Sequence, residues 1–362
     1  MKVIYDYKIF SQPYGGISRY YTTLANQLLK NGEDVQIIPG LHQNNYLKYL
    51  SGNLVNGKKL KRFPANTARI INLINHLYCE LEIKFQKPDI VHETYYSSLP
   101  HLKTNSVRVT SVYDMIHELY AEDFLINDKT RFLKKASISR VDHIISISQS
   151  TKNDLIEILG VDEKKISVVH LGVDTNAFNQ KLTTSIKKPY LLYVGKREGY
   201  KNFEGFLIAF SKSKKLKSEF SIIAFGGGVF STKEKKLIIE NNLENCIIQI
   251  GGDDNKLIEL YQNATAFVYP SKYEGFGLPP LEAMAAGCPV ISSNTSSMPE
   301  VINNAGELFD PFDIENIKHS IEKVVFSEAR TKELIKLGNE NLKKFSWSKC
   351  SKSTTETYKK IL

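Results

Sequence analysis

The chain has 362 residues, which is too long for one compact core, so two domains are the natural division. A hydrophobic content of 42% with 24% charged residues is typical of a globular protein and excludes a disordered chain. The four cysteines lie far apart without a Cys-x-x-Cys pair, which indicates neither a disulfide framework nor a zinc site and fits a reducing cytoplasm.

The net charge is +9, from 48 Lys and Arg against 39 Asp and Glu. Nucleic acid, an anionic membrane surface or small phosphates could each explain it. The basic runs lack the interleaved aromatics of nucleic-acid modules, so we interpret most of them as solvated faces, with peripheral membrane contact as the functional alternative. No uncharged apolar run approaches 18 residues and residues 1–7 enter a strand directly, so neither a membrane span nor a secretory signal is expected.

Short apolar runs alternate with helical patterns in the first half, which is typical of βαβ units and a parallel sheet. The segment Thr67–Gln86 has Ile and Leu at helical spacing, and we interpret it as a core helix and not a membrane-binding one. Strands are predicted at Lys2–Tyr7, Asp34–Ile38, Asp89–His92, Arg108–Val112, His143–Ser146 and Ile166–His170, and further helices at Tyr20–Lys30 and Thr151–Leu159.

A polar stretch without apolar periodicity, Gln180–Pro189, precedes a second α/β series. The predicted domains are therefore residues 1–172 and 189–345, joined by a linker at 173–188, with an amphipathic helix in 346–362. In the second series, strands are predicted at Tyr190–Val194, Ser221–Phe225, Cys246–Ile250, Ala266–Tyr269 and Pro289–Ser292, and helices at Phe203–Lys212, Lys233–Asn241, Asn255–Asn263, Pro280–Ala286 and Ile314–Phe326.

Two carboxylates, Glu274 and Glu282, flank a glycine-rich loop with seven residues between them. The amides of Phe276, Gly277 and Leu278 lie just before a helix N-terminus, where backbone donors and the helix dipole favour an anion. A carboxylate repels phosphate, so the two Glu residues would bind hydroxyl groups. A ligand with a phosphate between two polyhydroxylated parts is a nucleotide sugar.

Embedded in PSKYEGFGLPPLEAMAAGCPVI, this pattern resembles the signature of retaining family-4 glycosyltransferases of the GT-B fold. The resemblance is strong over Tyr190–Val301 and looser before Gly172. It implies an α/β protein with two Rossmann-like domains facing across a cleft, an acceptor-binding first domain, and a C-terminal helix that crosses back to that domain. In the family, the position of Glu274 contacts the donor sugar, that of Glu282 binds the ribose, and the loop amides hold the diphosphate.

The loop YVGKREGYKNF crowds Lys196, Arg197 and Lys201 at the end of the first strand of the second domain. Positioned cations stabilise a diphosphate leaving group, and the resemblance implies an Arg and a Lys here without a metal. Lys201 matches the family Lys because Asn202 follows it. Either Lys196 or Arg197 could hold the Arg position, and we choose Arg197 because a guanidinium bridges two phosphate oxygens better than an ammonium. No metal or other cofactor is expected.

Two first-domain motifs follow predicted strands. Gly15 and Gly16 precede a helix N-terminus, where their amides could face the donor phosphate, as in the family's glycine loop. Asp114 and His117 lie three residues apart in a turn, and relatives carry a His directly before the Asp, where this chain has Tyr113. His117 would take over the sugar contact, or Asp114 and His117 would serve the acceptor hydroxyl.

The glycines Gly226 and Gly252 end successive strands of the second domain, where the family seats the nucleotide base. The motifs together favour a retaining hexosyltransferase that uses a nucleoside-diphosphate sugar and a glycan or polyprenyl-diphosphate-linked acceptor. The phrases GGISRY, YKNF and FGGG resemble bacterial polysaccharide mannosyltransferases, which implies GDP-mannose as the donor, with UDP- and dTDP-sugars as open alternatives. The same resemblance implies O-antigen or capsule synthesis and a location in the cytoplasm or on the inner face of its membrane.

Two alternatives belong to other classes. A sugar-nucleotide epimerase or a phosphorylase would share the architecture but lacks the Glu-seven-Glu spacing. A non-catalytic sugar-nucleotide-binding or membrane-peripheral partner of a polysaccharide assembly complex would be expected to lose at least one of Arg197, Lys201, Glu274 and Glu282, and all four are present.

Overall fold

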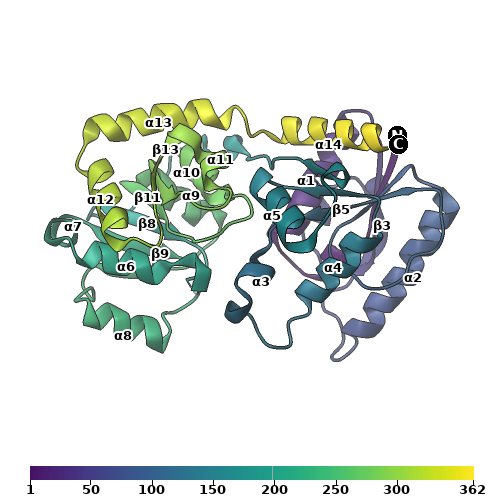
Figure 1. Ribbon diagram of the computed structural model, residues 1–362, viewed down its shortest axis with the longest axis horizontal. Coiled ribbons are helices and arrows are strands. Elements are labelled where there is room, and N and C mark those ends of the chain that lie inside the picture. The colour runs from purple at the N-terminus through teal and green to yellow at the C-terminus, as the bar shows by residue number, and fades with distance from the viewer. Residues whose placement is uncertain (198) are drawn as a thin grey trace. The chain divides into compact units, whose positions relative to one another are not determined.

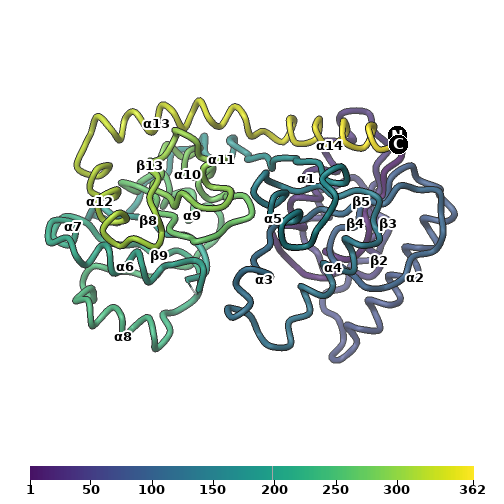
Figure 2. The backbone as a smooth tube through the Cα atoms, in the orientation of Figure 1, coloured from purple at the N-terminus to yellow at the C-terminus, as the bar shows by residue number. Residues whose placement is uncertain are grey.

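The computed structural model describes residues 1–197 and 199–362. The chain forms two compact units (Figure 1). The first contains Met1–Glu118, Leu125–Gly172 and Trp347–Leu362, and the second contains Leu119–Phe124 and Val173–Ser346. We call these units the first and second domains, and Figure 2 traces the backbone through each of them.

The first domain is built on a seven-stranded parallel sheet in the order β3-β2-β1-β4-β5-β6-β7. Its central strands are apolar and buried because helices cover both faces of such a sheet. The strands are β1 Lys2–Tyr5, β2 Asp34–His42, β3 Val55–Lys59, β4 Ile90–Glu93, β5 Val107–Val112, β6 His143–Ser146 and β7 Ile166–Val168. The helices are α1 Gly16–Lys30, α2 Ala68–Gln86, α3 Ile116–Leu119, α4 Thr130–Arg140, α5 Gln149–Leu159 and α14 Trp347–Ile361.

The last helix, α14, completes the first domain. The Tyr358 hydroxyl lies 2.6 Å from Nδ1 of His92, which is buried in β4. At the other end of α14, the Trp347 ring lies 6.0 Å from the Tyr20 ring of α1. The prediction that the C-terminal helix returns to the first domain is confirmed.

Helix α2 faces the opposite way from the prediction. Its apolar residues at positions 70, 73, 74, 77, 81 and 85 are exposed. Its inner face buries three polar side chains beside three apolar ones, which are Ile71, Cys79 and Ile83. Those polar groups are satisfied in the interior: Asn75 Nδ2 donates to the Leu41 carbonyl at 2.9 Å, and Arg108 Nη2 donates to Glu80 Oε2 at 2.8 Å. The interpretation of this segment as a core helix through its apolar face was wrong.

The second domain has a six-stranded parallel sheet in the order β10-β9-β8-β11-β12-β13. The strands are β8 Tyr190–Val194, β9 Ser221–Phe225, β10 Ile247–Ile250, β11 Ala266–Tyr269, β12 Val290–Ser293 and β13 Gly306–Phe309. The helices are α6 Phe203–Ser211, α7 Lys214–Glu219, α8 Thr232–Glu240, α9 Asp254–Asn263, α10 Leu278–Ala285, α11 Met298–Ile302, α12 Ile314–Val325 and α13 Glu328–Leu342.

Residues 173–188, which we expected to be a linker, belong to the second domain. Side chains at the end of α9 hold this segment. Gln262 Nε2 donates to the carbonyls of Phe178 and Gln180, each at 2.9 Å, and Asn263 Nδ2 donates to the Leu182 carbonyl at 2.9 Å. Residues 119–124, expected in the first domain, also belong to the second because Asp123 Oδ2 accepts the Tyr200 N–H at 2.8 Å.

Candidate active site

The candidate site lies at the carboxyl edge of the second sheet. Because the strands are parallel, the loops after β9, β8, β11 and β12 meet at this edge, and the strand order reverses between β8 and β11, where ligands bind in open α/β sheets. The backbone N–H of Lys272 donates to the Tyr200 carbonyl at 2.7 Å. The Thr295 hydroxyl donates to the Lys272 carbonyl at 2.8 Å. Three of the loops are therefore tied together.

Two predicted site residues, Lys201 and Glu274, form an ion pair at this edge. Lys201 Nζ lies 2.7 Å from Glu274 Oε1, and the side chains are only 19% and 10% exposed. The Glu274 backbone is fixed on both sides, since its N–H donates to Ser296 Oγ at 2.9 Å and its carbonyl accepts from Ser297 Oγ at 2.8 Å. The pair offers an ammonium and a carboxylate to one ligand. Two serines in the loop after β12 therefore hold the loop after β11.

The predicted amides lie at the start of α10, which begins at Leu278. Gly277 precedes the helix at φ 106°, a conformation that favours glycine, and an added Cβ would lie 2.5 Å from Met298 Cε. Phe276 is buried, with its ring 5.7 Å from the Phe345 ring. Pro279 and Pro280 have no backbone N–H, so the donors at the positive end of this helix dipole are the amides that precede them, those of Gly277 and Leu278. These two amides could bind an anion.

The second glutamate of the motif, Glu282, lies in the middle of α10 and contacts α9. The Tyr261 hydroxyl donates to Glu282 Oε2 across 3.5 Å. Burial raises the pKa of Tyr261 well above its usual range, and the Glu282 carboxylate adds to that rise, so this phenol stays a donor. Tyr261 therefore ties the Glu282 carboxylate to α9.

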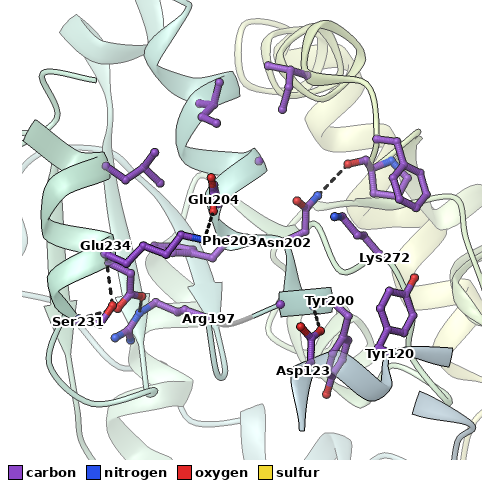
Figure 3. A pocket seen from close by; sticks show the side chains of 18 of the residues that line it. Tyr120, Asp123, Arg197, Tyr200, Asn202, Phe203, Glu204, Ser231, Glu234 and Lys272 are labelled. Atoms are coloured by element: carbon purple, nitrogen blue, oxygen red, sulfur yellow. Dashed lines mark hydrogen bonds and ion pairs between the residues drawn. The ribbon is translucent and has the colours of Figure 1, made fainter. Parts of the chain in front are cut away.

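Arg197, predicted as the phosphate cation, points into the second domain. The side chain is buried, and its guanidinium donates to Glu234 Oε1 at 2.5 Å and to the carbonyls of Gly226 at 2.7 Å and Gly228 at 2.9 Å. Figure 3 shows the guanidinium pointing toward Glu234 and Ser231. Most of its donors are thus used within the protein, whereas the neighbouring Lys196 is exposed. Which of the two cations binds the donor phosphate stays a prediction, and the inward orientation of Arg197 favours Lys196.

A cavity of about 600 Å³ lies beside this arginine (Figure 3). Arg197 is the one predicted site residue among those that line it in the described part of the chain. Asp123 and Gly199 also line it, and Gly199 leaves no room for a side chain, because an added Cβ would lie 2.0 Å from Asp123 Oδ2. Asp123 was not predicted as a site residue, because it belongs to no motif that the sequence displays.

The glycines predicted for the nucleotide base have different surroundings. Gly226 adopts φ 86°, and its N–H donates to the Ile250 carbonyl at 3.1 Å, so this amide is already bonded. Gly252 is exposed, and an added Cβ would lie 2.7 Å from Lys256 Cβ. Their role in base recognition stays a prediction.

The first-domain candidates lie at the carboxyl ends of β1 and β5. Gly15 caps α1, where its carbonyl accepts the Arg19 N–H at 3.0 Å, and Gly16 has open space around its Cα. Asp114 and His117 have different partners. Asp114 Oδ1 accepts the Ile116 N–H at 3.1 Å, whereas His117 Nε2 lies 3.8 Å from Asp128 Oδ2. Their catalytic roles stay predictions.

Comparison with known proteins identifies the family. A model described as glycosyltransferase family 4 matches residues 14–177, and one described as glycosyl transferases group 1 matches residues 174–341. The chain belongs to the family-4 glycosyltransferases and has the GT-B fold. This glycosyltransferase is 29% identical to the O-antigen chain mannosyltransferase RfbU of Salmonella typhimurium, over 77% of this chain and 78% of that protein.

Two further similarities extend over the whole glycosyltransferase. O-antigen chain mannosyltransferase B of Escherichia coli is 25% identical over 99% of this chain and 100% of its own. The crystal structure of HepE from Anabaena, in complex with UDP and glucose, matches with a TM-score of 0.74 at 14% identity over 99% of each chain, which supports the fold. Within residues 1–197 and 199–362, no helix is long and apolar enough to cross a membrane.

Proposed function

We propose that this glycosyltransferase is a retaining hexosyltransferase that transfers mannose from GDP-mannose to a hydroxyl of a glycan or lipid-linked acceptor during surface polysaccharide synthesis. The Lys201–Glu274 pair beside the N-terminus of α10 carries the proposal, because it combines a cation for phosphate with a carboxylate for sugar hydroxyls. The two mannosyltransferase relatives support mannose as the sugar and O-antigen or a related polysaccharide as the product.

The proposed donor site assigns one role to each group. Lys201, together with Lys196, holds the diphosphate, with the amides of Gly277 and Leu278 at the start of α10 on its other side. Glu274 orients the sugar through its hydroxyls, and Glu282 binds the ribose. Arg197 holds the glycine loop after β9 in place through its carbonyls.

The proposed reaction needs no nucleophile from the protein. The acceptor oxygen bonds to the anomeric carbon as the bond from that carbon to the diphosphate oxygen breaks, and the departing diphosphate takes the acceptor proton. Both events occur on one face of the sugar, which retains the anomeric configuration. Lysine ammonium groups compensate the charge on the leaving group, so we propose that the reaction proceeds without a metal.

The test is a thermal-shift panel of GDP-, UDP-, dTDP- and ADP-sugars in EDTA, on the unaltered protein and on Glu282→Ala. GDP-mannose should raise the melting temperature, because a ligand at 100 times its dissociation constant adds roughly 2.7 kcal/mol of stability. The shift should shrink in Glu282→Ala but persist in the control Glu240→Ala, which removes an exposed carboxylate of α8. An equal shift in both variants would contradict the ribose role.

Product analysis completes the test. With GDP-mannose and a glycan acceptor in EDTA, NMR should show an α-linked mannose, which has the configuration of the donor. A β-linked product, or transfer only after a divalent metal is added, would contradict the retaining, metal-independent mechanism. Transfer of another sugar at a higher rate would overturn the choice of mannose.

A further inference from the structure

Helix α2 presents an apolar face to solvent. Six of its large apolar side chains are 48–79% exposed, and at 100° per residue they span an arc of about 120° on one side of the helix. They are Ile70 61%, Leu73 48%, Ile74 48%, Leu77 56%, Leu81 49% and Phe85 79%. Figure 1 shows α2 at the outer edge of the first domain. A continuous apolar surface of this kind marks a site of interaction.

The opposite face of α2 explains why the helix cannot turn its apolar side inward. Asn75 makes hydrogen bonds to both the N–H and the carbonyl of Leu41, at 2.8 and 2.9 Å. Glu80 pairs with Arg108 at 2.8 Å, and its other oxygen lies 2.9 Å from Nδ1 of His101. Rotating the helix would leave these buried polar groups without partners, so the exposed apolar face is fixed by the fold.

The segment before α2 is basic and contains no acid. No Asp or Glu occurs between Asp34 and Glu80, whereas six basic residues do, all of them exposed: Lys48, Lys58, Lys59, Lys61, Arg62 and Arg69. These residues form the basic segment 48–69, which runs into the first turn of α2 and contacts the helix through β3. The Tyr78 hydroxyl of α2 donates to Asn56 Oδ1 of β3 at 2.6 Å, and Lys58 and Ile74 line one cavity of about 420 Å³.

We propose that α2 and the basic segment 48–69 dock on the surface of an anionic lipid bilayer. The apolar side chains would enter the boundary between headgroups and acyl chains, while the six cations would lie against lipid phosphates. A lipid surface supplies both of the chemistries that this face presents. A second copy of the chain would instead set its own six cations against six others, which disfavours a symmetric dimer through this face. The inference goes beyond the proposed function and depends on no assignment of donor or sugar.

Vesicle flotation tests the proposal with the full chain. The protein should float with vesicles of phosphatidylcholine and phosphatidylglycerol but not with phosphatidylcholine alone, and 0.5 M NaCl should weaken the binding. Leu77→Gln/Leu81→Gln should lower the partition coefficient at least tenfold. The matched control, Val229→Gln/Ile239→Gln, changes two exposed apolar residues of the second domain, at 84% and 60%, and should float like the unaltered protein.

A second pair of variants separates charge from apolar contact. Lys61→Glu/Arg62→Glu should reduce binding to the anionic vesicles at least tenfold, whereas Lys235→Glu/Lys236→Glu, the same charge change on α8, should leave it nearly unaltered. All four positions are exposed, so melting temperatures should stay close to that of the parent and show that every variant folds.

Three outcomes would overturn the proposal. The first is that the unaltered protein fails to float with anionic vesicles. The second is that Leu77→Gln/Leu81→Gln floats as well as its control. The third is that light scattering finds a dimer of the unaltered protein that Leu77→Gln/Leu81→Gln converts to a monomer. The last result would assign the face to self-association. Donor-induced thermal shifts measured on the same variants should be unchanged, so a failure of the donor assignment would be seen separately.

Discussion

Lys201 Nζ lies 2.7 Å from Glu274 Oε1, so the cation expected to hold the donor phosphate and the carboxylate expected to hold its sugar neutralise one another when no donor is bound. Both side chains are largely shielded from water, where such a pair interacts more strongly than on a surface. A bound donor would break this ion pair, but it would give Lys201 a phosphate and Glu274 a sugar hydroxyl as new partners. The pair thus leaves neither of these two shielded charges without an opposite charge beside it.

Separate replacement of the two partners should distinguish catalysis from folding. Lys201→Met and Glu274→Gln should each lower kcat/KM by roughly 10²–10³ and also lower the melting temperature, because each leaves a shielded charge without its partner. The double variant should recover most of the melting temperature but none of the activity. Initial rates and thermal unfolding on the three proteins check this, and a double variant with restored activity would mean that the pair is only structural.

The two adjacent cations of the loop after β8 should have separable effects. Arg197→Met should destabilise the second domain by about 3 kcal/mol, because it leaves Glu234 and the glycine-loop carbonyls without their donor. Lys196→Met, at an exposed position, should leave stability within ~0.5 kcal/mol but weaken donor binding. Urea unfolding and donor titration give the two readouts. The reverse result, in which Arg197→Met affects only donor binding, would restore the original assignment of Arg197 to the phosphate.

Two glycines with positive φ flank α10 and provide a matched comparison. Gly277→Ala and Gly287→Ala, at φ 106° and 73°, should each cost about 1–2 kcal/mol through backbone strain. Only Gly277 has a close neighbour, Met298 Cε at 2.5 Å, and only Gly277 adjoins the predicted phosphate amides. Gly277→Ala should therefore also abolish the donor-induced thermal shift, which Gly287→Ala should preserve. Equal shifts in the two variants would argue against phosphate binding at this end of α10.

The buried carboxylate of Asp6, at the end of β1, should make the first domain's stability depend on pH. Burial raises the pKa of Asp6 from 3.8 to about 6, although hydrogen bonds from Thr94 oppose the rise. The folded state then holds the proton more tightly than the unfolded chain. Ionisation of Asp6 therefore lowers the free energy of unfolding. This loss is absent below pH 3.8, grows up to about pH 6, and is constant above it.

Asp6→Asn should remove this dependence, because an amide oxygen can still accept the Thr94 N–H that Asp6 Oδ1 accepts at 2.8 Å. The unfolding free energy of the variant minus that of the parent should be ~1 kcal/mol larger at pH 8 than at pH 5. Urea unfolding at the two pH values checks the difference. A constant offset between the proteins at both pH values would show that Asp6 keeps an ordinary pKa in the folded state.

Much of the fold follows from patterns that sequence alone displays. Apolar runs of four to five residues, such as Tyr190–Val194, lie where the parallel strands are observed, because strands covered on both faces need no polar positions. The motif residues Lys201 and Glu274 were also correctly expected at one edge of one sheet, since the loops after adjacent parallel strands meet there. The short strands β3 and β13 and the helices α4 and α13 were missed.

Other differences concern the direction in which a side chain or a helix face points. The spacing in α2 revealed an apolar stripe, but a stripe does not show whether it faces the core, and here the interior bonds of Asn75 and Glu80 decide the orientation. Likewise, the order Lys196–Arg197 does not reveal which side chain turns inward. The Arg197 guanidinium donates to carbonyls of the loop after β9, which is far from Arg197 in the sequence. The sequence around Arg197 does not indicate this tertiary contact.

The return of residues 347–362 to the first domain has a consequence for biosynthesis. Tyr358, which lies against His92, and Trp347, which lies against Tyr20, leave the ribosome only after the whole of the second domain. The domain that is encoded first is thus the last to complete its core. A nascent chain that has reached Ser346 still exposes the surface of α1 that α14 will cover, and during that interval it is a natural client for a chaperone.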